Sequence, residues 1–188
     1  MLVALILSIA AQTAPSTTSA STPPPSTARA SIELLSALSA QGTTSNVDTA
    51  LTSWLGVRVG GVNTDQGGLF FGGDGTVSVG VENAGTADVA YGRVPALLEG
   101  RGLVGARLRR GFVGLGGYGY GGAGVGLGAA TITVFDKIES RGFVTTTIRA
   151  GVGAETSLGP VMLRLETGAG VRDLRFEIHG SAALGVRW

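Results

Sequence analysis

Cysteine is absent from this chain of 188 residues, and lysine occurs only once, as Lys137. Without thiols the protein cannot form disulfides, carry a lipid on cysteine or bind zinc through sulfur. The single histidine, His179, excludes a histidine-rich metal site, so no metal or other cofactor is predicted. Charged residues reach only 14%, well below the quarter that is usual in soluble domains.

A long apolar run is also missing, although hydrophobic residues make up 44% of the chain. The sequence therefore contains no obvious membrane-spanning helix, which needs roughly eighteen consecutive apolar residues. The formal net charge is +1, so the chain has no general attraction to nucleic acid, and no nucleic-acid partner is predicted. Few charges without a long apolar run form an unusual combination for a cytosolic domain.

The first thirty residues are typical of an exported protein. An apolar stretch followed by small residues predicts a secretory signal peptide over residues 1–14. This segment has no Lys or Arg before the apolar stretch, and three cleavage sites remain open, after Ala10, Ala11 or Ala14. Residues 15–30 hold four of the six prolines among Ser, Thr and Ala, which predicts an extended, solvated linker.

Residues 31–42 predict a short helix. Ser31 can cap its first turn, Glu33 complements the positive end of the helix dipole, and Gly42 can end it. A helix of about ten residues is marginal on its own. We therefore expect it to dock on the rest of the protein or on a partner.

From residue 50 onward, short alternating runs of apolar and polar residues are separated by turn residues. They predict eight strands, near residues 50–62, 76–83, 88–98, 103–119, 124–136, 142–158, 161–171 and 174–188. The last run alternates most strictly, with apolar side chains at Leu174, Phe176, Ile178, Ala182, Leu184, Val186 and Trp188. Because successive side chains of a strand point to opposite faces, this strand has one apolar and one mostly polar face.

The predicted fold is all-β: an eight-stranded antiparallel up-and-down transmembrane β-barrel over residues 50–188, preceded by the short helix. An even number of strands with short connections allows the last strand to pair with the first, which satisfies the backbone hydrogen bonds within the sheet. Pro95 lies inside the third predicted strand and predicts a bulge or a strand end there. The consecutive Arg109 and Arg110 predict a second bulge.

Aromatic residues provide a test of a membrane barrel, because they collect at strand ends, where the membrane interfaces lie. Both tryptophans and all three tyrosines fall near one predicted rim: Trp54, Tyr91, Tyr118, Tyr120 and Trp188. Five of the six phenylalanines fall near the other: Phe70, Phe71, Phe135, Phe143 and Phe176. The predicted aromatic girdle consists of Trp54, Tyr91, Tyr118, Tyr120, Trp188, Phe135, Phe143 and Phe176.

The export signal, the amphipathic strands and a final strand, HGSAALGVRW, resemble the small outer-membrane β-barrels of Gram-negative bacteria, of the OmpA and OmpX type. The resemblance covers residues 50–188 as an architecture, without a matching stretch of sequence. It implies a location in the bacterial outer membrane and contact with its lipid. It also implies that the barrel-assembly machinery reads the C-terminal strand, with Trp188 as the terminal aromatic. It implies no function.

The polar faces of the predicted strands line an interior. A turn at Gly159 and Pro160 places Glu155 opposite Arg164, and a turn at Arg172 and Asp173 places Glu166 opposite His179. Side chains fill the interior of an eight-stranded barrel. We therefore predict an ion-pair network in the lumen, formed by Arg58, Glu82, Arg149, Glu155, Arg164, Glu166, His179 and Arg187. This network is either a core of satisfied charges or a constriction with a proton-sensitive gate at His179.

Glycine is abundant, and ten glycines lie between residues 111 and 128. Glycine lets a sheet bend sharply, or lets another surface approach its backbone closely. This segment is therefore interpreted as curvature of the barrel, or as a wall that contacts lipid, the 31–42 helix or a partner protein. It includes a G-x-G-x-x-G pattern, but the sequence that follows predicts a strand, which argues against a dinucleotide site.

Three functions remain open. The preferred one is a non-enzymatic structural or accessory membrane component that binds a protein partner through residues 111–128 or 31–42, or forms a narrow pore. The second is a lipid hydrolase, because His179-Gly180-Ser181 is similar to the His-x-Ser of the PagL-type lipid A deacylases. Ser181 would be the nucleophile, His179 the base and Glu166 the orienting carboxylate, although no acidic residue follows Ser181 as in that family. The third is a soluble glycine-rich β-sandwich envelope protein.

Overall fold

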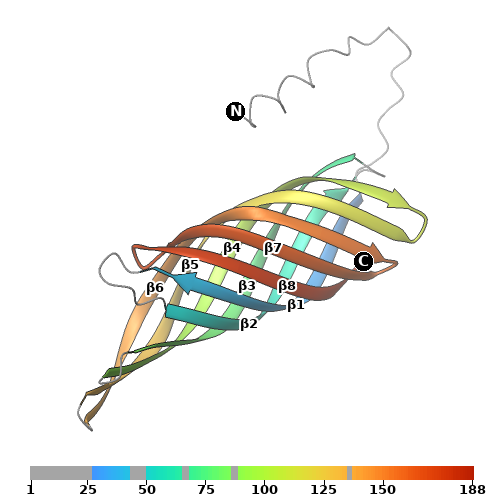
Figure 1. The fold of residues 1–188 in the computed structure, drawn as a ribbon. Helices are drawn as coiled ribbons and strands as arrows, with labels where there is room; N and C mark the ends of the chain where they lie inside the picture. Colours follow the sequence, from blue (N-terminus) through green and yellow to red (C-terminus); the bar gives the residue numbers. More distant parts are fainter. Residues whose placement is uncertain (1–26, 43–49, 65–67, 86–88, 135–136) are drawn as a thin grey trace, which may run out of the picture.

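The computed structural model describes residues 27–42, 50–64, 68–85, 89–134 and 137–188. They form eight antiparallel strands that pair in sequence order, and the first strand also pairs with the last (Figure 1). The sheet is therefore a closed up-and-down barrel, as predicted. Its strands are β1 (Thr27–Gln41), β2 (Ala50–Thr64), β3 (Gly68–Gly85), β4 (Val89–Arg110), β5 (Val113–Val134), β6 (Lys137–Leu158), β7 (Val161–Arg172) and β8 (Arg175–Arg187).

No helix among the described residues is long and apolar enough to cross a membrane. The predicted helix over residues 31–42 is wrong, because residues 31–41 belong to β1. The capping signals at Ser31 and Glu33 are local and weak, whereas β1 forms ladders with both β2 and β8. The predicted boundaries of the linker, 15–30, and of the barrel, 50–188, are wrong for the same reason: the barrel begins at Thr27. Residues 1–26, with the predicted signal peptide, lie outside the described residues.

The predicted number of strands, eight, is correct only because two errors in the prediction cancel each other. One strand, β1, was missed, and the two strands β4 and β5 were predicted as three, 88–98, 103–119 and 124–136. The glycine-rich segments 99–102 and 120–123 resemble turns but lie inside strands. The hairpin turn is instead at Gly111 and Phe112, where Gly111 has a φ of 62° that favours glycine.

The strand registers contain no bulge among the described ladders. Pro95 lies opposite Gly128 of β5, and the ladder to β3 is interrupted at Val94 and Pro95 without a shift in register. Proline has no N–H to donate, so the strand omits ladder pairs on one side and continues. The predicted bulge at Arg109 and Arg110 is also absent, because the strand runs regularly into the turn that follows.

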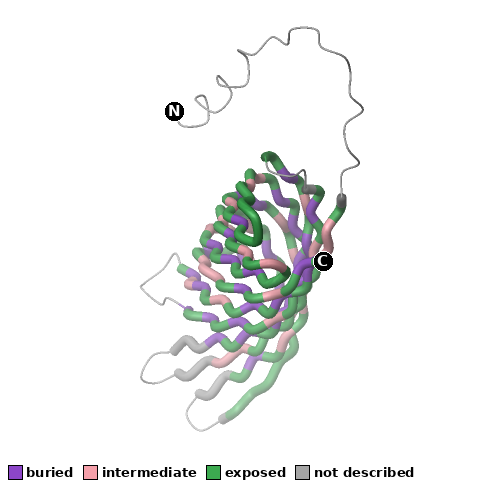
Figure 2. Tube along the Cα trace, turned by 90° about the vertical axis from the view of Figure 1, so that its right-hand side faces the viewer, coloured by how far each residue is buried: buried purple, intermediate pink, exposed green. Residues whose placement is uncertain are grey.

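Inward and outward side chains alternate along every strand, as the burial pattern in Figure 2 shows. The outer face carries large apolar residues on each strand, including Leu34, Leu55, Val77, Leu98, Leu127, Val152, Leu165 and Leu184. Among the described side chains, Arg110 is the only charged residue on this face of the strands. Apart from Arg110 at the end of β4, this belt carries no charge among the described side chains, which is what a sheet in contact with lipid requires.

The two ends of the barrel differ. One end carries the start of β1, the end of β8 and the two-residue turns of the β4–β5 and β6–β7 hairpins. At the other end β4, β5 and β6, each of 22 residues, extend beyond β7, which has 12, so residues 137–146 of β6 have no partner in β7 (Figure 1). Outer-membrane barrels, the class expected from the sequence, have short periplasmic turns and longer extracellular extensions. On that basis we call the end with the β4–β5 and β6–β7 turns the periplasmic end, and the opposite end the extracellular end.

The two predicted hairpin turns had different outcomes. Gly159 and Pro160 form the β6–β7 turn, and Glu155 lies opposite Arg164, so that prediction is confirmed. The β7–β8 turn is one residue later than predicted, at Asp173 and Leu174. Glu166 therefore lies opposite Ser181 instead of His179. The shift in register is two residues, which keeps every side chain on its predicted face.

This turn holds Leu174 in a strained conformation. Its φ is 64°, and its side chain is 96% exposed, so no packing interaction compensates for the left-handed backbone. Replacing Leu174→Gly should raise the free energy of unfolding by about 1 kcal/mol, measured by urea titration of the chain in lipid vesicles. The control Leu163→Gly, on the lipid-facing side of β7, should lower it. A destabilised Leu174→Gly variant would contradict the interpretation.

Candidate functional site

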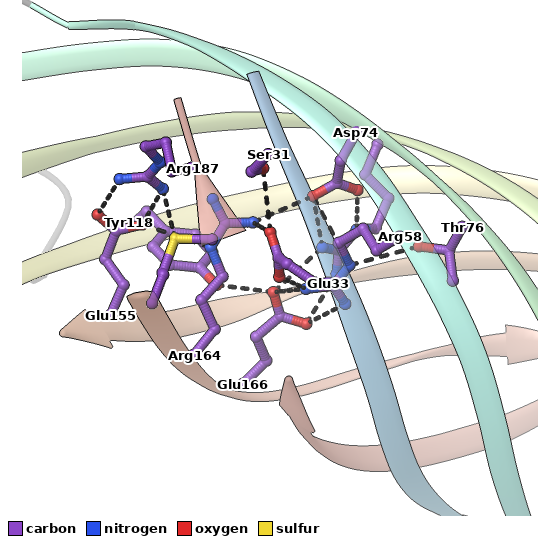
Figure 3. Close-up of polar contacts among 12 residues, drawn as sticks. Ser31, Glu33, Arg58, Asp74, Thr76, Tyr118, Glu155, Arg164, Glu166 and Arg187 are labelled. Carbon is purple, nitrogen blue, oxygen red and sulfur yellow. Dashed lines mark hydrogen bonds and ion pairs between the residues drawn. The ribbon is translucent and has the colours of Figure 1, made fainter. Parts of the chain in front are cut away.

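The interior of the barrel is filled by charged side chains, and Glu166 lies at their centre (Figure 3). Its carboxylate accepts hydrogen bonds from Arg58 Nη2 at 2.9 Å and from Arg101 Nη1 at 2.9 Å. The hydroxyls of Tyr118, at 2.7 Å, and Ser181, at 3.0 Å, also donate to it. Four elements, β2, β4, β5 and β8, are thus tied to one carboxylate on β7.

Two further carboxylates complete the central cluster. Asp74 accepts two hydrogen bonds from the Arg101 guanidinium, each at 2.8 Å, in the planar two-point geometry that arginine favours. Glu33 lies 3.4 Å from Arg58 Nη1 and 3.0 Å from Arg164 Nη1. All five side chains are buried, so their charges are shielded very little by solvent.

A second group of ion pairs closes the interior towards the periplasmic end. The carboxylate of Glu155 lies 3.3 Å from Arg164 Nε and 3.0 Å from Arg187 Nη2, and it also pairs with Arg107. Arg187 Nη2 lies 2.6 Å from the sulfur of Met162. Since Arg187 belongs to the last strand and Arg107 to β4, Glu155 on β6 joins strands that are far apart in the sheet.

A third group lies nearer the extracellular end. Arg172 contacts Glu82 at 3.0 Å and Glu177 at 2.6 Å. Arg149 contacts Glu177 at 2.8 Å and Glu99 at 3.1 Å. These contacts link five strands, because the residues lie on β3, β4, β6, β7 and β8.

Arg93 covers the extracellular end of the interior. Its guanidinium lies 3.2 Å from Asp173 and 3.6 Å from Glu82. The guanidinium carbon also stands 3.8 Å above the ring of Phe143, a cation–π contact. Arg93 therefore holds the β7–β8 turn, β3 and the extended part of β6 together.

The interior behaves as a packed core of charges. Eight buried or half-buried arginines each lie within 4.0 Å of a carboxylate. An unpaired buried charge is very costly, so an arrangement of this kind persists only when every charge has a partner. A cavity of about 30 Å³ remains between Trp54, Arg101 and His179, enough for roughly two water molecules.

The structure brings seven of the eight predicted lumen residues into ion pairs, and His179 into a hydrogen bond with Tyr120 Oη at 2.6 Å. Sequence reasoning missed nine other participants in the ion pairs that fill or cover the interior: Glu33, Asp74, Arg93, Glu99, Arg101, Arg107, Arg172, Asp173 and Glu177. Most of these lie in segments predicted as a helix or as turns. Glu177 could have been predicted from the sequence, because it lies two residues before His179 and therefore on the same, inward face of the strand.

The predicted aromatic girdle is wrong for Trp54, Tyr118 and Tyr120, which are buried in the interior, as is Phe70 from the opposite predicted rim. Trp54 Nε1 donates to Ser39 Oγ at 3.0 Å. Alternate residues of each strand point inward, and Trp54, Tyr118, Tyr120 and Phe70 occupy inward positions. The prediction failed because it considered only how close each aromatic residue lies to a strand end. Phe71, Phe176 and Trp188 are exposed on the outer side, and Phe143 is half-buried beneath Arg93. Phe135 and the side chain of Tyr91 lie outside the described part of the structure.

The inward glycines provide room for these rings. A Cβ at Gly151 would lie 2.6 Å from Tyr120 Oη, and one at Gly168 would lie 2.8 Å from it. A Cβ at Gly122 would lie 2.6 Å from Cγ of Arg101. At all three positions a Cβ would also meet a backbone carbonyl of the neighbouring strand, of Thr167, Ala150 and Gly100 respectively. Glycine is therefore required both by the close approach of the neighbouring backbone and by the large interior side chains.

The hydrolase geometry is not assembled. Ser181 Oγ donates to Glu166 at 3.0 Å, while His179 Nε2 contacts Tyr120, and no hydrogen bond joins Ser181 to His179 in the described structure. Both side chains also point into the packed interior, away from lipid. The catalytic arrangement needs a direct contact from serine to its base, which this site lacks.

Neutralising Glu166 tests the interior network. The variant Glu166→Gln leaves Arg58 and Arg101 with one carboxylate fewer, and should lower the free energy of unfolding by about 3–5 kcal/mol in lipid vesicles. Glu139→Gln is the matched control, because the Glu139–Arg141 pair is exposed and should contribute less than about 1 kcal/mol. Equal effects of the two variants would contradict a buried, mutually dependent network.

No protein-family model and no curated protein matches the sequence. The structure resembles that of Ail, the attachment invasion locus protein of Yersinia pestis, with a TM-score of 0.52 and 16% identity over 85% of this chain and 98% of Ail. Ail in complex with the heparin analogue sucrose octasulfate gives 0.51 and 14%, over 86% and 99%. The N-terminal β-barrel domain of Pseudomonas aeruginosa OprF gives 0.43 and 12%, over 84% and 97%. The closed ring of eight strands and the likeness to Ail give the chain the fold of the small eight-stranded β-barrels of the bacterial outer membrane.

Proposed function

We propose that this protein is a non-enzymatic, non-conducting outer-membrane barrel that binds an extended segment of a protein partner at a free sheet edge. The observation that carries the proposal is the unpaired side of β6 over residues 137–145, which we call the free edge. Within the described residues, no strand pairs with this side, because β7 ends at Arg172. An exposed edge is a template for another strand.

The free edge begins at a defined point. The carbonyl of Thr146 accepts a hydrogen bond from Asp173 N at 3.0 Å, and Thr146 N donates to Asp173 Oδ1 at 2.9 Å. The backbone groups of Thr146 therefore face β7. Because backbone groups of alternate residues point to the same side of a strand, those of Ser140, Gly142 and Val144 face the free edge.

A partner strand fits this edge by β-augmentation. Main-chain hydrogen bonds give affinity in this mode, and alternate side chains give specificity. Glu139 and Arg141 are exposed and lie 3.1 Å apart, so charges flank the edge. Charged side chains on an edge oppose pairing between identical copies, which leaves the edge for a chosen partner.

The two partner sites predicted from the sequence, residues 31–42 and 111–128, have different roles in this barrel. Residues 31–41 are part of the wall as β1, so they are not proposed as a docking helix. The outward-facing Gly117, Gly119 and Gly121 of β5 keep the 111–128 segment open to close approach, as a secondary contact for a membrane partner. We also infer that the barrel-assembly machinery reads β8, whose outward side chains are exposed up to Trp188.

The closed interior predicts that the barrel does not conduct. The ion pairs across the lumen leave space for roughly two water molecules beside Trp54, far less than a continuous channel. The purified full chain should therefore give no resolved current steps in planar lipid bilayers, in contrast to a porin measured in parallel. Reproducible unitary steps from the intact chain would overturn this part of the proposal and support the narrow pore.

The free edge predicts a position-specific effect of proline. Ser140→Pro removes an edge N–H without removing a hydrogen bond to β5, so the barrel should fold normally. Capture of the partner by the full chain, with a photocrosslinker at Gly142 in whole envelopes, should fall at least tenfold in this variant. Ser140→Ala keeps the N–H and is the matched control, which should capture the partner as the natural chain does.

Folding of each variant is verified by its mobility in unheated gels and by circular dichroism. A defined crosslinked companion that disappears in Ser140→Pro and persists in Ser140→Ala supports the edge. A companion that survives in both variants, or that appears equally with the crosslinker at Leu55 on the lipid face, would contradict it.

A further inference from the structure

The periplasmic end of the barrel carries a tip that combines two arginines with two large apolar side chains. It consists of Leu108, Arg109, Arg110, Gly111 and Phe112, which we call the basic hairpin. Arg109 and Arg110 are exposed, and Leu108 and Phe112 are 79% and 80% exposed. The interior network described above uses none of these residues.

The basic hairpin is held in place by its neighbours. The carbonyl of Phe112 accepts a hydrogen bond from Gly159 N of the adjacent β6–β7 turn at 2.8 Å. Arg109 Nε donates to the carbonyl of Gly111 at 3.2 Å, across the turn. The tip therefore presents its side chains in a defined orientation, which lowers the entropic cost of binding.

Within the described part of the chain, the charges of the basic hairpin have no acidic counterpart. Every arginine of the interior lies within 4.0 Å of a carboxylate, whereas neither Arg109 nor Arg110 has such a partner among the described residues. Arg110 is also the only charged side chain of the described strands that faces outward, towards lipid. No described carboxylate neutralises the charge at this place, so its guanidinium is available to an anion from outside the protein.

The apolar neighbours indicate where that anion lies. Leu108 and Leu115 face the lipid on paired positions of β4 and β5, directly above the turn. An exposed phenylalanine at the end of such a band is typical of the boundary between hydrocarbon and headgroups. Arg109 and Arg110 are then level with the lipid phosphates, which guanidinium groups bind through paired hydrogen bonds.

We propose that the basic hairpin binds the headgroup phosphate of an anionic phospholipid in the periplasmic leaflet. The lipid around the periplasmic end of the barrel is then enriched in anionic phospholipid. The hairpin is a lipid site distinct from the free edge, and it does not depend on any protein partner. Phosphatidylcholine also carries a phosphate, but its positive choline group opposes binding to a pair of arginines. Selection therefore depends on the net charge of the headgroup.

The test uses the full chain in phosphatidylcholine vesicles that contain a trace of spin-labelled phosphatidylglycerol or spin-labelled phosphatidylcholine. The ratio of the two association constants gives the preference for the anionic lipid. Replacing both Arg109→Gln and Arg110→Gln should lower this ratio, by about five-fold for each arginine at low salt. The matched control replaces Arg141→Gln and Arg175→Gln, two exposed arginines at the opposite end. It removes the same net charge and should retain most of the preference.

Salt gives an independent measure, because screening should weaken the preference of the natural chain as ionic strength rises. All four arginines are exposed, so the variants should fold as the natural chain does, which circular dichroism verifies. An unchanged ratio in the hairpin variant would overturn the proposal. An equal loss in both double variants would also overturn it, since the preference would then follow net charge alone.

Discussion

Closure of the sheet is the constraint on which the rest of the structure depends. Once β1 pairs with β8, every strand side chain faces either lipid or a narrow interior, and no third environment remains. Lipid does not tolerate charge, so the carboxylates and guanidiniums of the strands gather inside. There each needs an opposite charge, which explains a low charged fraction that is nearly balanced in sign. Arginine suits this interior better than lysine, because one planar group contacts several carboxylates at once.

The narrow interior also explains the glycine content. Long arginines and the rings of Tyr118 and Tyr120 occupy the space that side chains of neighbouring strands would otherwise fill. Glycine at Gly151 and Gly168 admits the Tyr120 hydroxyl, and Gly122 admits the stem of Arg101. The glycines therefore follow from packing as much as from bending of the sheet. They also mislead sequence reasoning, because glycine is the usual mark of a turn.

The period of two was enough to predict a closed antiparallel barrel and to assign inward and outward faces over β6, β7 and β8. The count of eight strands was correct only because the missed β1 was offset by an extra strand predicted within β4 and β5. It could not identify partners across the barrel, such as Arg58 with Glu166, which depend on curvature and on side-chain length. The segment that became β1 carries local helix signals, while its pairing with β2 and β8 is remote in sequence. The β7–β8 turn was predicted one residue too early, so the predicted cross-strand neighbour of Glu166 was wrong. The Glu166 side chain was nevertheless assigned to the correct, inward face of the sheet. The aromatics were misassigned because the position along a strand was considered without its parity.

The interior and the free edge of β6 meet at one residue. Asp173 accepts a hydrogen bond from Arg93, which covers the charged core, and another from Thr146 N, where the pairing of β6 with β7 ends. The point at which β6 leaves the barrel is therefore fixed by the same contacts that close the lumen. A barrel with a filled interior has only its surfaces available for recognition, and here the core itself sets where the unpaired backbone begins. The stability of the interior and the proposed binding at the free edge are then linked through the short β7–β8 turn.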